Sequence, residues 1–130
     1  MGLQQDVVLR QIRDMERLLA QLLLRKDFSE IEETAESLAK RDGRVPESGN
    51  AFLDTLVRMA DQGDVCAAED LLLENIPAGD ESYLELALIF YLHVSEMEDE
   101  LLENSNYSKE EIPDGLEMLA EAYGVSGIRM

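Results

Sequence analysis

The sequence contains no tryptophan, one cysteine, one histidine and three prolines among its 130 residues. A single cysteine cannot form an internal disulfide, which excludes a small secreted scaffold held together by disulfides. One histidine and one cysteine cannot complete a common zinc site without two carboxylates, and no acidic loop has the spacing that binds calcium. No glycine-rich phosphate loop is present either. We therefore expect no metal site, no cofactor and no enzymatic activity.

Basic side chains are scarce as well, with 11 Lys and Arg against 29 Asp and Glu, a net charge of −18. Binding to nucleic acid depends on Lys and Arg, so we expect no nucleic-acid partner. Residues 1–65 carry nine basic and 13 acidic side chains, whereas residues 66–130 carry two and 16. This asymmetry favours a basic partner for the second half; the alternative is that acidic helices are soluble and repel one another.

Long hydrophobic runs are also missing. The longest apolar stretch, residues 83–94, contains Glu85 and His93 and is far shorter than the ~20 residues that span a bilayer. The first residues lack the basic start and apolar run of a secretory signal, and the Ser or Thr of a myristoylation motif does not follow Gly2. We expect a cytoplasmic protein without membrane contact.

Apolar residues make up 45% of the chain and recur at helical spacing in nearly every segment. The pattern predicts one all-α domain over residues 1–130, with about six helices in antiparallel hairpins and no strand. The predicted helices cover residues 6–25 (a long N-terminal helix within 1–27), 29–41, 50–61, 65–76, 80–103, and a last segment that restarts at Asp114 after Pro113. Residues 43–50 are expected to form a loop and residues 124–130 a frayed tail.

The helix expected over residues 80–103 differs from the others. Asp80 is a suitable N-cap, and residues 83–94 are apolar on most sides. A helix that is apolar nearly all round is contacted from several directions. We therefore expect this helix at the centre of the fold.

One helix pair carries a weak repeat signal. In residues 50–77, Gly63 precedes Ala68 by five positions and Leu72 follows four later, which resembles the turn and second helix of a tetratricopeptide repeat. Leu56 stands where that repeat has a small residue, and no second copy follows at a 34-residue period. Both a tetratricopeptide-like right-handed array and a compact helical bundle remain open.

The N-terminal run from Gln4 to Asp27 resembles the opening of a family of small helical bacterial proteins of unknown function. The resemblance covers roughly the first 27 residues. It implies a cytosolic, helical-repeat-like protein, and it brings no activity and no site residues.

Two residues are candidates for chemistry. His93 lies among apolar neighbours, where it is either a general base in a small-molecule or catalytic pocket or an imidazole at the core edge with one hydrogen bond. Cys66 lies near the start of its helix, beside Ala67 and Ala68, and no local base or cation would activate its thiol. In both cases the structural interpretation is favoured.

An acidic face is expected near the end of the 80–103 helix. Glu96, Asp99, Glu100 and Glu103 fall within eight residues, and Glu96, Glu100 and Glu103 would share one side of a continuous helix. Either solvent screens these charges, or a cation comes from the Arg10, Arg13 and Arg17 stripe of the first helix or from a basic partner.

The first helix has more apolar surface than one neighbour covers. A heptad seam predicts a homodimer, with the contact at Ile12, Met15, Leu19 and Leu22. The leading hypothesis is therefore a non-enzymatic protein–protein interaction module that uses a helical groove or an acidic face. An acidic regulator or decoy that binds a basic protein is the alternative, and a pocket near His93 is the third.

Overall fold

A computed structural model describes residues 2–39, 50–74, 76–77 and 79–128, and side chains for all of these except residues 2–5 and 39. All regular elements in these residues are helical, which confirms the all-α class. In chain order they are α1 (Gly2–Leu19), the π-helical turn η1 (Ala20–Leu24), α2 (Phe28–Ala39), α3 (Ala51–Asp61), α4 (Val65–Glu74), α5 (Glu81–Ser95), α6 (Asp99–Asn104) and α7 (Glu111–Ala122).

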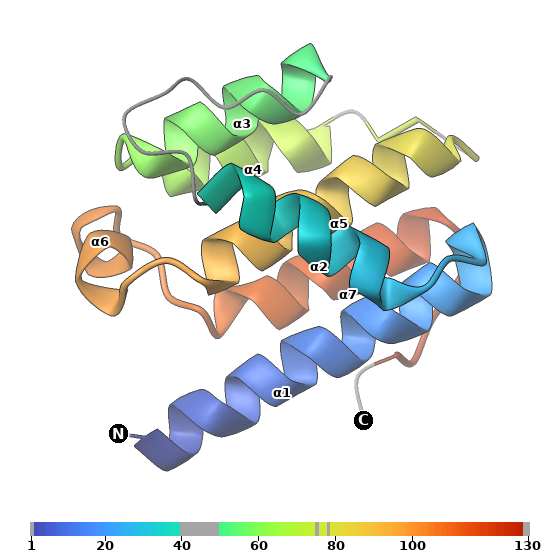
Figure 1. Cartoon of the computed structure of the whole chain (residues 1–130), viewed down its shortest axis with the longest axis horizontal. Coiled ribbons are helices and arrows are strands. Elements are labelled where there is room, and N and C mark those ends of the chain that lie inside the picture. Colours follow the sequence, from blue (N-terminus) through green and yellow to red (C-terminus); the bar gives the residue numbers. More distant parts are fainter. Residues whose placement is uncertain (1, 40–49, 75, 78, 129–130) are drawn as a thin grey trace.

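Helix α5 lies at the centre of the fold, as predicted. It packs against α1, η1, α2, α3 and α7, and Figure 1 shows it crossing between the α3–α4 pair and the layer of α1 and α7. Eleven consecutive or nearly consecutive side chains of α5 are buried, from Leu84 to Ser95. Burial on all sides follows from its composition, because a helix with apolar residues all round has no face suited to water.

The other helices are arranged around α5 and do not form a regular stack of hairpins. Helix α3 packs on its neighbour α4, but α2 packs chiefly on α5 and α1 packs on α7 and α5. The α3–α4 hairpin covers the segment that resembles a tetratricopeptide repeat. A tetratricopeptide-like array is not confirmed, because most contacts join helices distant in the sequence.

The long N-terminal helix ends in an unusual way. The α-helical turns of α1 change at Ala20 into the π-helical turn η1, and Arg25 stops the helix in a left-handed conformation with φ 53°. The next residue, Lys26, places Nζ 2.9 and 3.0 Å from the two carboxylate oxygens of Glu85 on α5. This ion pair fixes the end of the helical segment to the central helix.

The predicted continuous helix over residues 80–103 is wrong, although Asp80 does cap α5 through the Ser82 and Tyr83 amides. The chain leaves the helix after Ser95 and starts again at Asp99. The break moves Asp99 and Glu100 into the first turn of α6. Carboxylates are favourable at a helix N-terminus and unfavourable at a C-terminus, so the break relieves the acidic run.

The expected interruption at Pro113 is also wrong. Helix α7 begins at Glu111, so Pro113 lies in the first turn, where its missing N–H is not needed. Ahead of the helix, the Ser108 amide donates to Glu111 Oε2 at 2.8 Å, as in one half of a capping box. The expected fraying does not hold for residues 124–128, because Ile128 is buried in the core; residues 129–130 lie outside the described residues.

Helix α2 begins one residue before the predicted Ser29, with Asp27 accepting the Ser29 amide at 3.1 Å. The predicted loop over residues 43–50 lies outside the described residues except for Asn50, which caps α3 through the Leu53 amide at 3.0 Å. No helix in the described parts of the chain has both the length and the apolar character required to cross a membrane.

Candidate functional site

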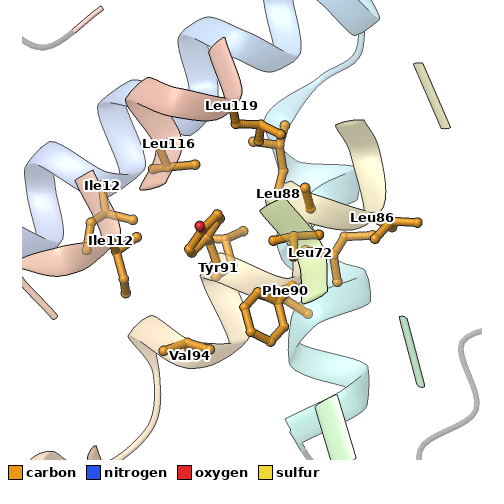
Figure 2. Close-up of a cluster of buried hydrophobic side chains, with 14 of the residues drawn as sticks. Ile12, Leu72, Leu86, Leu88, Phe90, Tyr91, Val94, Ile112, Leu116 and Leu119 are labelled. Atoms are coloured by element: carbon orange, nitrogen blue, oxygen red, sulfur yellow. The ribbon is translucent and has the colours of Figure 1, made fainter. Parts of the chain in front are cut away.

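Two buried tyrosines and one glutamate meet where α4, α5 and α7 come together. Tyr91 Oη on α5 donates to Glu69 Oε2 on α4 at 2.8 Å, and Tyr107 Oη, just before α7, donates to the same oxygen at 3.2 Å. Figure 2 shows the Tyr91 ring among apolar side chains of α1 and α7, including Ile12, Ile112 and Leu116. We call Glu69, Tyr91 and Tyr107 the tyrosine–glutamate cluster.

Gly115 of α7 closes the tyrosine–glutamate cluster. A Cβ atom at this position would collide with the Tyr91 hydroxyl group and would lie 2.7 Å from Glu69 Oε2. The backbone of α7 can approach α4 and α5 this closely only because residue 115 has no side chain. Glycine usually weakens a helix interior, so its presence here reflects the close approach.

Burial and charge shift the pKa of all three residues of the tyrosine–glutamate cluster upward. Burial, followed by the negative charge of Glu69, raises the pKa of Tyr91 and of Tyr107 far above the usual tyrosine value, so both hydroxyl groups stay donors. Burial also raises the pKa of Glu69, and the charges of Glu111 and Asp70 act in the same direction, while the two tyrosine hydrogen bonds oppose the rise.

An open hollow of about 430 Å³ lies above the cluster, between α4 and α7. Five carboxylates and no basic side chain are among the described residues that line it. We call it the acidic hollow; its lining is Glu69, Asp70, Leu73, Glu74, Glu111, Asp114, Gly115 and Met118. The side chain of Met118 is 56% exposed, so the hollow offers an apolar contact beside concentrated negative charge.

The predicted acidic face is divided between two structural elements. Because the helix breaks after Ser95, Glu96 does not share a helix with Glu100 and Glu103 as the sequence pattern predicted. Glu96 accepts from Arg13 Nη2 at 3.0 Å, so the first helix supplies a cation, one of the two sources considered. Asp99 lies 3.5 Å from Lys109 Nζ. All four carboxylates of the predicted face are exposed.

The residues predicted for a dimer contact are mostly inside the monomer. Ile12, Met15 and Leu19 are at most 2% exposed, whereas Leu22 is 54% exposed. The predicted dimer contact must therefore be corrected for Ile12, Met15 and Leu19, because α5 and α7 of the same chain already cover this side of α1. The dimer itself stays a prediction. The outward side of α1 forms a separate hollow of about 410 Å³ with Ile128.

His93 and Cys66 both have structural surroundings. His93 is 5% exposed, and its Nε2 lies 2.7 Å from Asp61 Oδ1 while its Nδ1 has no partner. This matches the expected imidazole with one hydrogen bond, and Glu96, one turn away, pairs with Arg13 instead. The Cys66 thiol faces the Ser105 and Asn106 carbonyl oxygens at 3.5 and 3.6 Å, and burial, then nearby carboxylates, raise its pKa.

Sequence reasoning missed both Gly115 and Glu16. A glycine inside a helical pattern signals a close backbone approach, but the expected start at Asp114 placed Gly115 at a helix end. Glu16 lies four residues after Ile12 and three before Leu19, within an apolar stripe. It is completely buried, and neither of its carboxylate oxygens has a hydrogen-bond partner.

Within residues 2–39, 50–74, 76–77 and 79–128, no three His, Cys, Asp or Glu side chains are grouped closely enough to hold a metal ion. The five carboxylates of the acidic hollow are therefore spread around an open space and do not converge on one point.

The comparisons with known proteins give one positive result. Residues 2–124 match the model of a family described as "Family of unknown function (DUF6483)". No curated protein and no solved structure matches the chain. The family match extends the resemblance seen in the first 27 residues to nearly the whole sequence. The chain belongs to this family of unknown function.

Proposed function

We propose that this protein is a non-enzymatic binding module that holds a basic segment of a partner protein in the acidic hollow between α4 and α7. One observation carries the proposal: five carboxylates and no basic side chain among the described residues line a single hollow of about 430 Å³. This volume is in the range of pockets that accept a small organic group, such as the end of a lysine or arginine side chain.

The electrostatics of the hollow support a cationic occupant. Glu69 has a raised pKa partly because Glu111 and Asp70 repel its charge. A bound ammonium or guanidinium group would reduce this repulsion and favour the ionised carboxylate. The wider surroundings also favour a cationic ligand, since residues 66–130 contain only two basic side chains against 16 acidic ones. A negative field of this kind also speeds the approach of a basic partner.

The apolar part of the lining suits the same ligand. Leu73 and the exposed Met118 lie beside the carboxylates. Lysine and arginine side chains pack their hydrocarbon stems on apolar surface while the charged end meets a carboxylate. The hollow thus offers both kinds of contact to one side chain.

A synthetic arginine- and lysine-rich peptide can test the proposal by NMR titration of the isotope-labelled protein. We expect the largest shift changes at the amides of Leu73, Gly115 and Met118, and an affinity that falls as salt is added. The triple substitution Asp70→Asn, Glu74→Gln and Glu111→Gln should weaken binding about tenfold or more, because it removes three of the charges that line the site.

A matched control removes the same number of charges elsewhere. Glu98→Gln, Glu100→Gln and Glu103→Gln neutralise exposed carboxylates at or beside the predicted acidic face, so both triple variants have the same net charge. Binding should be nearly unchanged in this control. If both triple variants lose the same affinity, or if the shift changes spread evenly over the acidic surface, the peptide responds to total charge and the hollow is not the site.

A further inference from the structure

The buried carboxyl group of Glu16 does not line the acidic hollow, and no hydrogen bond compensates for its burial. Its side chain is completely buried, and neither Oε1 nor Oε2 has a hydrogen-bond partner. It projects from the same side of α1 as Ile12, Met15 and Leu19, which all belong to the core. An ionised carboxylate in such a position is costly, whereas the protonated acid is tolerated at a smaller cost.

The groups that act on Glu16 come from three helices. Arg13 lies one turn earlier on α1, Glu32 comes from α2, and the hydroxyl group of Tyr91 belongs to α5. Burial raises the pKa of Glu16 well above its usual 4.5; the Arg13 charge opposes this rise, and the Glu32 charge adds to it. Helix α7 also packs on α1, but its carboxylates are exposed or half-buried: Glu111, Asp114, Glu117 and Glu121.

Arg13 is the only cation among these groups, and other carboxylates bind it. Its Nη1 donates to Glu32 at 2.7 Å and its Nη2 donates to Glu96 at 3.0 Å. These two hydrogen bonds connect α1 to α2 and to the end of α5. Residues three apart on a helix are close enough to pair, so Arg13 could turn toward Glu16 and away from its partners on the other helices.

We propose that α1 is a pH-sensitive strap, which stays closed on α2, α5 and α7 while Glu16 carries its proton and loosens when Glu16 loses it, with Arg13 then changing partner from Glu32 and Glu96 to Glu16. The loosened helix would uncover Ile12, Met15 and Leu19, the seam that the monomer buries. The movement of α1 requires no ligand, because the protonation state of Glu16 determines which carboxylate Arg13 binds.

The direction of the effect follows from proton linkage. The native state holds the Glu16 proton at pH values where the unfolded chain, with a carboxyl pKa near 4.5, has released it. Stability gained from the protonated, closed state is therefore complete below that value and is lost as the pH rises through the native pKa. The strap loosens with increasing pH.

Hydrogen exchange followed by mass spectrometry, corrected for the intrinsic rate at each pH, can test the strap at about pH 5 and about pH 8. The protection of residues 8–19 should fall about tenfold or more over this range, the equivalent of at least one pKa unit. The α3–α4 hairpin does not contain the strap and serves as the internal reference. Glu16→Gln, which resembles the protonated acid, should make the protection of α1 independent of pH.

Glu33→Gln is the matched control, because Glu33 is an exposed glutamate on α2; this variant should behave like the natural sequence. Should Glu16→Gln fail to fold, Glu16→Met removes the buried polar atoms and must flatten the pH dependence in the same way. The proposal is overturned if the protection of α1 does not change with pH, or if a Glu16 variant keeps the full change.

The partner exchange of Arg13 has its own test. Glu32→Gln combined with Glu96→Gln frees Arg13 and removes one repelling charge, so ionised Glu16 becomes easier to form. Loosening should then begin at a lower pH than in the natural sequence. An unchanged midpoint would show that Arg13 does not switch between carboxylates.

Discussion

Glu16 is fully buried in the core and Glu69 is partly buried at its edge, and their carboxyl groups have different surroundings. Glu69 accepts one hydrogen bond from Tyr91 and one from Tyr107, and it also lines the acidic hollow. Glu16 is completely enclosed and accepts none. Tyr91 is common to both surroundings, since its hydroxyl group donates to Glu69 and ionised Glu16 would also raise its pKa.

The difference shows that burial alone does not define the state of a carboxyl group. Desolvation raises the pKa of both residues, but in Glu69 the two tyrosine donors counteract part of the rise. Glu69 is therefore a structural anchor with a fixed set of donors. Glu16 has no such donors, so its charge state is open to control by pH and by Arg13.

The largest effect is expected from closing the space over Glu69. Gly115→Val would place methyl groups where the Tyr91 hydroxyl group and Glu69 Oε2 now lie, and α7 would have to move away from α4 and α5. We expect a loss of about 3 kcal/mol in the free energy of unfolding, measured by urea denaturation. Gly115→Ala should also destabilise, although alanine normally stabilises a helix relative to glycine by about 1 kcal/mol. Met118→Ala, an exposed change on the same helix, is the control, and a stabilising Gly115→Ala would contradict the packing seen here.

An intermediate effect is expected from making Glu69 more like Glu16. Tyr91→Phe removes the shorter of its two hydrogen bonds and should lower the free energy of unfolding by about 2 kcal/mol. It should also raise the pKa of Glu69 further, because hydrogen bonds to the ionised form are lost. NMR titration of the side-chain carboxyl carbon measures this change. Tyr83→Phe is a suitable comparison, since its hydroxyl group binds the Leu72 carbonyl oxygen and not the cluster; equal pKa changes in both variants would argue against a specific role for Tyr91.

The smallest effect on the free energy of unfolding is expected from replacing the buried carboxyl group of Glu16. Glu16→Met replaces a buried polar group that has no partner with an apolar side chain of similar size, and should stabilise the protein by about 1 kcal/mol at neutral pH. The gain should shrink as the pH falls below about 4.5, where Glu16 is protonated in both the native and unfolded states. Thermal unfolding at several pH values provides the measurement, and a gain that stays the same in acid would show that the ionisation of Glu16 does not contribute to it.

Much of the fold could be predicted from the sequence because apolar spacing is a local signal. The all-α class, the central position of residues 83–94 and the Asp80 cap follow from such patterns. The break after Ser95 could not be read from spacing, since it depends on placing acidic residues at the start of a new helix. Likewise, the covering of Ile12 and Met15 by helices far along the chain is a tertiary property that a heptad pattern does not contain.

The candidate site was less accessible to sequence reasoning. Glu69 lies beside the apolar stripe of its helix, and its two tyrosine donors are 22 and 38 residues away. The acidic hollow arises only when α4 and α7 are brought side by side. Two local signals were nevertheless present: Gly115 within a helical pattern, and Glu16 within an apolar stripe.

The packing of α1 on α7 has a consequence for how the molecule is made. More than 90 residues separate Leu19 from Glu111, so the apolar side of α1 leaves the ribosome long before the helix that covers it. Until α7 has been synthesised, the side of α1 that packs on α7 lacks its native packing partner. The newly made chain is thus exposed to chaperone capture and to self-association for most of its synthesis.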